Sequence, residues 1–146
     1  MKKLDFLIEI KASKQKVWNV LWDDANYRKW TTVFCEGSNA VSDWHEGSKV
    51  LFLSPNGEGM FSIIHKKIPN EFMSFKHLGT VKGGQEQPEN DETKKWSGAM
   101  ENYSLLEKNG LTELAVTMDI TDDHEQYFKD TFPKALEAIK NLAEAN

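Results

Sequence analysis

The sequence predicts an α+β fold in which a curved antiparallel β-sheet of about six or seven strands wraps around a long C-terminal α-helix. Two short helices are expected after the first strand. Alternating apolar residues, typical of strands with one buried face, recur through most of the chain. The pairs Asn56-Gly57 and Asn109-Gly110 mark tight hairpin turns. An apolar stripe at helical spacing ends the sequence, and such a helix needs a concave surface to cover.

The N-terminal segment predicts one strand followed by two short helices. Residues 4–11 alternate between apolar and polar side chains and therefore favour a strand. Ser13 is a suitable N-cap for an amphipathic helix over residues 14–22. The acidic pair Asp23-Asp24 can cap a second helix. That helix is expected to bury Tyr27 and Trp30.

From residue 32 to residue 120 the pattern indicates strands. Two runs meet around Asn56-Gly57, and Pro69-Asn70 separates the second of them from the next strand. Residues 82–95 include two glycines, a proline and many charged side chains, without any apolar residue. This composition predicts a mobile loop with no packed element, which could act as a flap.

The turn at Asn109-Gly110 sets the register of the last hairpin. Glu101 then faces Met118 and points inward, beside Tyr103. An inward carboxylate is costly unless it is paired, hydrogen-bonded or in a wet cavity. We expect its donor to be a water, a ligand, or a histidine or lysine of a neighbouring strand. The register alone does not make Tyr103 a donor, since residues two apart on one face point outward in parallel. The inward row of the second strand is Leu114, Val116, Met118 and Ile120.

The C-terminal helix is expected over residues 124–145, capped by Asp122 or Asp123. Pro133 lies within it and predicts a kink or the loss of one backbone hydrogen bond. A sheet wrapped around a helix leaves a natural pocket between them. The helix stripe consists of Phe128, Phe132, Ala135, Leu136, Ile139, Leu142 and Ala143.

Composition narrows the functional classes. One domain over residues 1–146 is expected, and the net charge of −5, with mixed signs, offers no basic stripe for nucleic acid. No apolar run could span a membrane, and no signal peptide is expected. A cytoplasmic location is the resulting expectation. Cys35, the only cysteine, lacks a local partner base and is expected to be a small core residue.

The histidines leave two interpretations open. If the chain turns at residues 69–71, His65 faces Phe75 and His77 faces Ile63, so both histidines share one face. They could form a polar spot in the pocket, or they could be half-buried side chains bonded to neighbours. The His spacing and the absence of carboxylates at ligand spacing predict no metal site, and no cofactor is expected. The five tryptophans could fill the core or form aromatic walls that present an N–H to a ligand.

Five segments together carry a family resemblance: "ASKQKVWNVLWDDANYRKWT", "WHEGSKVLF", "PNEFMSFKHLG", "KKWSGAMENYSLL" and "FPKALEAIKNLAEA". The chain resembles the helix-grip, START-like or birch-pollen-allergen-like (SRPBCC) superfamily, and within it the bacterial branch similar to the activator of heat-shock-protein ATPase. Lys16 departs from the acidic residue that the family often has there. The resemblance implies a helix-grip domain with a cavity for an apolar or amphipathic small molecule.

We therefore expect a small-molecule binding protein that holds a hydrophobic or amphipathic ligand between sheet and C-terminal helix. One alternative is a cyclase- or hydratase-type enzyme with Glu101, Tyr103 and a histidine as acid–base groups. Another is a chaperone-ATPase-activator-like interaction protein, whose partner the sequence does not identify. No catalytic residue is assigned. The candidate cavity-lining residues are Glu101, Tyr103, Val116, Met118, His65, His77, Phe75, Trp30, Phe128 and Phe132.

Overall fold

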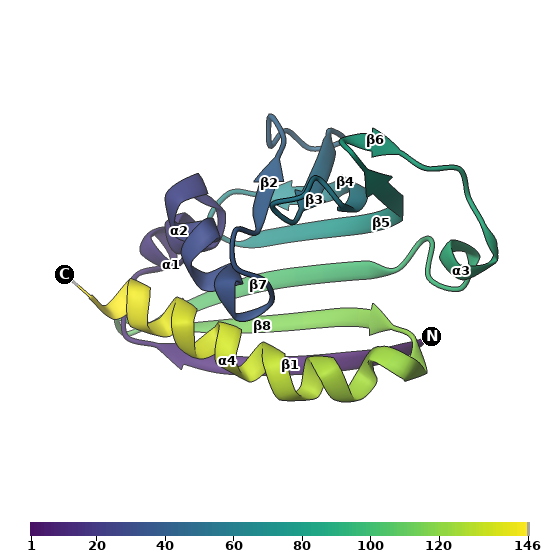
Figure 1. The fold of residues 1–146 in the computed structure, drawn as a ribbon. Coiled ribbons are helices and arrows are strands. Elements are labelled where there is room, and N and C mark those ends of the chain that lie inside the picture. Colours follow the sequence, from purple (N-terminus) through teal and green to yellow (C-terminus); the bar gives the residue numbers. More distant parts are fainter. Residues whose placement is uncertain (146) are drawn as a thin grey trace.

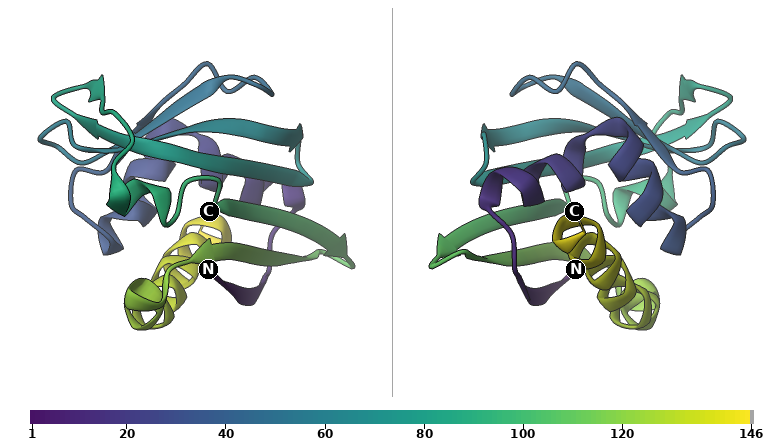
Figure 2. Two further views of the ribbon diagram at one scale, coloured as in Figure 1. Left: turned by 90° about the vertical axis from the view of Figure 1, so that its right-hand side faces the viewer. Right: turned by 90° about the vertical axis from the view of Figure 1, so that its left-hand side faces the viewer.

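The computed structural model describes residues 1–145. An antiparallel sheet of eight strands curves around the long helix α4 (Glu125–Glu144), with the two short helices α1 and α2 beside the helix (Figures 1 and 2). The strand order in the sheet is β1-β8-β7-β5-β4-β3-β2, and β6 pairs with β5. The strands are β1 (Lys2–Ile10), β2 (Asn39–Val41), β3 (Lys49–Leu53), β4 (Gly59–Ile68), β5 (Phe72–Lys82), β6 (Gln85–Glu86), β7 (Met100–Lys108) and β8 (Leu111–Ile120).

The last hairpin has the predicted register. β7 and β8 are joined by Asn109-Gly110, and both residues have positive φ, as a two-residue turn of this kind requires. Glu101 lies opposite Met118 and Tyr103 lies opposite Val116. The inward direction of the Glu101 side chain is therefore confirmed.

The predicted pairing of β4 with β5 was wrong in its middle. Two register shifts interrupt the ladder, one between Phe61 and Ser62 and one between Ile64 and Lys66. Between them Ser62 lies opposite His77, and Ile64 lies opposite Phe75. A one-residue slip turns a side chain to the other face of a sheet, and a bulge adds an unpaired residue. His65 is that residue, and its side chain is exposed.

Both short helices form where they were predicted. α1 (Lys14–Trp22) begins at Ser13, whose hydroxyl accepts a hydrogen bond from the Lys16 N–H at 3.2 Å. α2 (Asp24–Trp30) is capped by Asp23, and a 3₁₀ turn, η1 (Thr31–Val33), follows it. Tyr27 and Trp30 are buried, as expected.

Helix α4 carries the predicted stripe, but it does not begin at an acidic cap. A 3₁₀ turn, η2 (Asp122–His124), precedes it, and His124 in the N-cap position makes no side-chain capping bond. The stripe packs on β1, α1 and α2. Phe132 stacks on Phe6 of β1, with ring centroids 5.0 Å apart. The buried residues of the stripe are Phe132, Ala135, Leu136, Ile139 and Ala143, while Phe128 and Leu142 are partly buried.

Two expectations for surface segments were wrong. Residues 82–95 contain β6 and a one-turn helix, α3 (Asp91–Lys94). Asn90 and Thr93 form a reciprocal capping box there, which orders a polar segment without apolar burial. Cys35 is exposed instead of buried, because it follows η1 on a surface turn.

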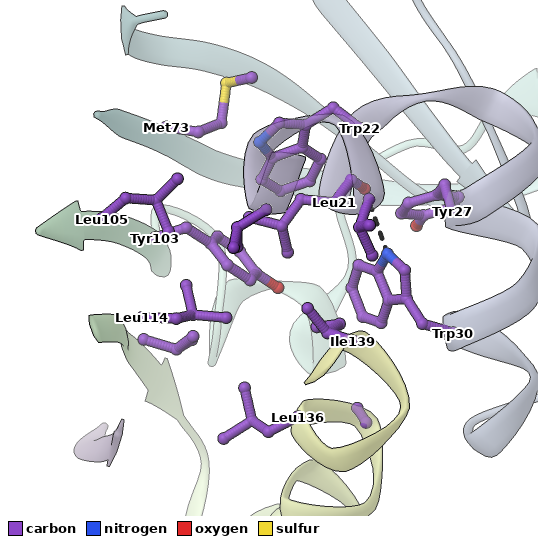
Figure 3. Packing of buried hydrophobic residues seen from close by; sticks show 14 of the residues in the cluster. Leu21, Trp22, Tyr27, Trp30, Met73, Tyr103, Leu105, Leu114, Leu136 and Ile139 are labelled. Atoms are coloured by element: carbon purple, nitrogen blue, oxygen red, sulfur yellow. Dashed lines mark hydrogen bonds between the residues drawn. The ribbon is translucent and has the colours of Figure 1, made fainter. Parts of the chain in front are cut away.

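The hydrophobic core lies between the sheet and the helices (Figure 3). Leu136 and Ile139 extend from α4 toward the sheet residues Leu114 and Tyr103 (Figure 3). The Trp30 indole N–H donates to the Leu21 carbonyl oxygen at 3.2 Å, so this polar group is satisfied inside the core.

Candidate ligand-binding site

A cavity of about 490 Å³ lies between the sheet and the N-terminal part of α4, with α2 and the segment after it along one side. Its walls come from residues far apart in the sequence, because the curved sheet brings β3, β4, β5, β7 and β8 to one concave face. The lining residues are Trp22, Tyr27, Trp30, Thr31, Phe34, Ser38, Asn39, Phe52, Leu53, Ser54, Glu58, Gly59, Met60, Phe75, His77, Glu101, Tyr103, Met118, Phe128 and Phe132.

A second cavity of about 270 Å³ adjoins the first. The two share Met60, His77, Glu101, Met118 and Phe128, so the Glu101 carboxylate lies at their boundary. The second cavity has a more polar end. Its remaining lining residues are Trp96, Ala99, Asp119, Ile120, Thr121 and His124.

Glu101 is held in a hydrogen-bonded chain of four side chains. His77 Nε2 lies 3.0 Å from Glu101 Oε1, and Ser62 Oγ lies 2.6 Å from His77 Nδ1. The Tyr103 hydroxyl donates to Glu101 Oε2. A histidine of a neighbouring strand is therefore one donor, as expected. Tyr103, which the register alone did not make a donor, is a second one, since strand side chains lean along the strand and a long phenol spans two residues.

A neutral His77 satisfies all the hydrogen bonds that link these four side chains. The Ser62 hydroxyl then donates to Nδ1, and the Nε2–H donates to Glu101. Ser62 and Tyr103 are fully buried or nearly so, whereas 21% of the Glu101 side chain remains accessible. The carboxylate is thus the member of the chain that meets the cavity with acceptor capacity to spare.

The environment keeps Glu101 ionised and Tyr103 protonated. Burial acts to raise the pKa of Glu101, but the hydrogen bond from His77, the positive charge of this imidazole when it is protonated, and the bond from Tyr103 outweigh it, so this pKa lies below its usual value. Burial, with the nearby Glu101 carboxylate, raises the pKa of Tyr103 well above its ordinary value. Both groups keep their usual neutral-pH forms.

The order Ser62–His77–Glu101 is similar to a hydrolase triad, but Ser62 is not placed to act as a nucleophile. Its relative exposure is 0%, and it lines neither cavity. A nucleophile must be reachable by the substrate. Ser62 therefore acts on the orientation and tautomer of His77.

Aromatic rings surround the carboxylate. Phe75 contacts Tyr103 and Phe52 edge-on, with centroids 6.4 and 5.1 Å apart. Tyr27 packs against Trp30 at 5.4 Å. The Tyr27 side chain lines the cavity and is 8% exposed, and no hydrogen bond among the described residues involves its hydroxyl. The cavity thus combines aromatic walls with polar groups that include the Glu101 carboxylate and the Tyr27 hydroxyl.

Several solved structures have a similar architecture. An Aha1 dimer from Colwellia psychrerythraea is 22% identical, with a TM-score of 0.75 over 99% of this chain and 97% of that one. The protein MLL2253 from Mesorhizobium loti is 13% identical, with a TM-score of 0.73 over 97% and 96%. The chain has the helix-grip, SRPBCC-like fold.

DynU16, from the dynemicin biosynthetic locus, shares the helix-grip fold at 10% identity and a TM-score of 0.73. The match covers 99% of this chain and 48% of DynU16. No protein-family model matches the sequence, and no curated protein matches it significantly. At these identities the likeness establishes the helix-grip fold alone.

Most of the predicted site residues meet at the helix-grip cavity. Val116 and His65 do not: Val116 is sealed in the core, and His65 is the exposed residue at the bulge in β4. No residue of 82–95 lines either cavity, so the described part of this loop gives no flap over them. The predicted site residues that line the larger cavity are Glu101, Tyr103, Met118, His77, Phe75, Trp30, Phe128 and Phe132.

Sequence reasoning missed several lining residues. Phe52 and Met60 lie on strands whose inward face was not assigned, although the alternation around Asn56-Gly57 could have indicated them. Tyr27 was predicted to be buried without a link to the cavity. Of the two interpretations of the tryptophans, Trp30 fits core filling, because its N–H is bonded to the Leu21 carbonyl oxygen, and the N–H of Trp22 is buried without a partner among the described residues.

Neither a metal-binding cluster nor a membrane-spanning helix is found among residues 1–145. No group of three or more His, Cys, Asp or Glu side chains in this range could hold a metal ion. No helix in the same range is long and apolar enough to cross a membrane.

Proposed function

We propose that this protein binds a hydrophobic or amphipathic small molecule in the cavity between the sheet and α4. The observation that carries the proposal is the cavity of about 490 Å³, with aromatic and aliphatic walls and the buried Glu101 cluster on one side. Ligand sites are typically concave and mostly apolar, with volumes of roughly 300–1,000 Å³ and a few fixed polar groups. The ordered Glu101 chain would fix the orientation of the ligand's polar end.

An acid–base enzyme in the same cavity is the second candidate, because Glu101, His77 and Tyr103 do converge within hydrogen-bond reach. The directions in which the pKa values of Glu101 and Tyr103 shift argue against such an enzyme. A general base works best with a pKa near the working pH. The pKa of Glu101 moves down, which weakens it as a base, and that of Tyr103 moves up, which weakens it as an acid. These shifts suit recognition better than proton transfer.

The third candidate, a protein-interaction module, needs an exposed apolar patch. Among residues 1–145, the large exposed apolar side chains within regular elements are Leu7, Val41, Ile68, Leu106 and Tyr127. They are spread over β1, β2, β4, β7 and α4, one on each element. This distribution gives the cavity the stronger claim as the functional site.

The test is a titration with N-phenyl-1-naphthylamine, a neutral probe whose fluorescence rises in apolar sites. Saturable binding to the wild-type protein is expected. Met60→Trp should abolish it, because Met60 lines both cavities and a larger side chain takes up their volume. Leu106→Trp, on an exposed position of β7, is the matched control and should leave binding unchanged.

Native mass spectrometry of gently purified protein would complement the titration by revealing a co-purifying small molecule. Failure of the wild-type protein to bind the probe, or equal binding by Met60→Trp, would contradict the proposed function.

A further inference from the structure

The walls of both cavities carry negative charge without any fixed positive charge. Glu58 and Glu101 line the larger cavity, and Asp119 lines the smaller one. Among the described lining residues, none is a lysine or an arginine. Among these described lining residues, only the imidazoles of His77 and His124 can take up a positive charge. A ligand with a carboxylate, sulfate or phosphate would therefore meet acidic groups and no partner.

The position of the carboxylate strengthens this preference. Glu101 lies at the boundary of the two cavities, and it keeps its charge because His77 and Tyr103 donate to it. Neither donor need carry a positive charge, since Nε2–H and a phenol hydroxyl are both neutral donors. With a neutral His77, the four-residue chain holds one net negative charge next to an apolar space. Such a charge is stabilised by a cation that enters the space.

The aromatic walls favour the same ligand class. Phe52, Phe75, Tyr103 and Phe128 all line the cavity that Glu101 faces. The negative faces of such rings attract organic ammonium groups, an effect that grows when water is excluded. Tyr27 is 8% exposed and no hydrogen bond among the described residues involves its hydroxyl, which adds a second oxygen that can accept a hydrogen bond from an ammonium N–H.

We propose that the cavity selects amphiphiles with a protonated amine over neutral and anionic ones, with the ammonium group on Glu101 and the apolar body against the aromatic walls. This inference rests on the proposed function, since it names the ligand class of the same cavity. The salt bridge would form with the accessible part of the Glu101 carboxylate, while His77 and Tyr103 hold that carboxylate in place.

The experiment compares three probes that share one apolar body: 2-naphthylmethylamine, 2-naphthylmethanol and 2-naphthoate. Each displaces N-phenyl-1-naphthylamine at about pH 8, above the usual titration range of histidine. The amine is expected to bind roughly tenfold more tightly than the alcohol, as a charge-assisted hydrogen bond in a desolvated site allows. The carboxylate is expected to bind more weakly than the alcohol.

Two variants locate the effect. Glu101→Gln should remove most of the amine's advantage over the alcohol, because the neutral amide cannot pair with the ammonium group. Glu113→Gln is the matched control, because Glu113 lies on the same hairpin but faces solvent. It should keep the full advantage. A titration in high salt excludes attraction by the overall charge of −5, which salt screens, whereas a buried pair is screened much less.

Three results would overturn the inference while leaving the proposed function intact. These are equal or tighter binding of the alcohol, tightest binding of the carboxylate, and loss of the amine's advantage in high salt. The wild-type series decides the question even if Glu101→Gln does not fold. If none of the three probes displaces N-phenyl-1-naphthylamine but that probe itself binds, only the inference fails. If N-phenyl-1-naphthylamine does not bind either, the proposed function fails with it.

Discussion

The two halves of helix α4 face different surroundings. The C-terminal half buries Ala135, Leu136, Ile139 and Ala143 almost completely. The N-terminal half presents Phe128 and Phe132 to the cavity, and no other residue of α4 lines it. Both halves continue one apolar stripe, so the periodicity of the helix does not distinguish the solid half from the hollow one. The difference comes from what lies opposite each half.

Opposite the solid half lie buried side chains that include several aliphatic ones. Helix α1 contributes Val17, Val20 and Leu21, which are all buried, and it contacts α4 directly. Opposite the hollow half lies the Glu101 chain, whose groups are tied to one another instead of to the helix. A buried hydrogen-bonded network stays where its partners hold it and does not collapse onto an apolar neighbour. The hydrogen bonds of the Glu101 chain therefore hold its polar groups at the cavity wall.

The largest effect is expected where the two halves meet. Phe132→Ala should lower the free energy of unfolding by roughly 3–5 kcal/mol, because the ring is buried and stacked on Phe6. Chemical denaturation measures this loss. A loss below about 1 kcal/mol would show that this face of α4 is not core.

A pair of substitutions sharpens the contrast between the halves. Ile139→Ala should cost roughly 2–5 kcal/mol, since the residue is fully buried in the solid half. Phe128→Ala should cost roughly 1 kcal/mol or less, because the ring is only partly buried and one side faces the cavity. Equal losses in denaturant titrations would contradict the division of the helix.

The stability contribution of Glu101 should depend on pH. Its pKa in the folded protein is below the usual value, so its ionised form stabilises the fold above the unfolded-state pKa of about 4.3, and this contribution is lost as the pH falls through the folded-state pKa. Glu101→Gln should therefore destabilise by roughly 1–3 kcal/mol at neutral pH and by less in acid.

Urea denaturation of wild type and variant across the acidic range checks this prediction, with Glu113→Gln as the solvent-exposed control. A stability difference for Glu101→Gln that stays constant down to the most acidic pH would show that the ionised carboxylate is not what stabilises the site.

A smaller effect than that of Glu101→Gln is expected for Ser62→Ala. It removes one hydrogen bond to His77 in a fully buried position and should cost roughly 0.5–1.5 kcal/mol. Nitrogen chemical shifts of His77 would report the tautomer, which should become mixed when Nδ1 loses its donor. Unchanged shifts would mean that the bond to Glu101 alone sets the ring's protonation.

The sequence was most informative where local chemistry determines the structure. The Asn109-Gly110 turn determined the register that turned Glu101 inward, and Ser13 and Asp23 marked the starts of two helices. Bulges carry no such local signal, which is why the strand carrying His65 was paired incorrectly. The bond from Tyr103 to Glu101 depends on side-chain lean and could not be read from alternation.

The cavity itself was less predictable than its walls. Eight of the ten candidate residues line it: inward alternation indicated those on the strands, and helical spacing indicated Trp30, Phe128 and Phe132. Whether that face packs solidly or leaves a hollow depends on side chains from several elements at once. Phe52, Met60 and Tyr27 complete the walls from segments whose relation to β7 appears only in three dimensions.

The most direct measurement of the central claim uses the methionine methyl groups as reporters. Met60 and Met118 line both cavities, whereas Met73 is buried in the core and lines neither. Methyl NMR spectra are recorded during a titration with N-phenyl-1-naphthylamine. The Met60 and Met118 signals should shift and show intermolecular contacts with the probe, while Met73 should stay in place. Saturable binding that leaves Met60 and Met118 unshifted, or that shifts Met73 equally, would contradict a ligand site between the sheet and the N-terminal half of α4.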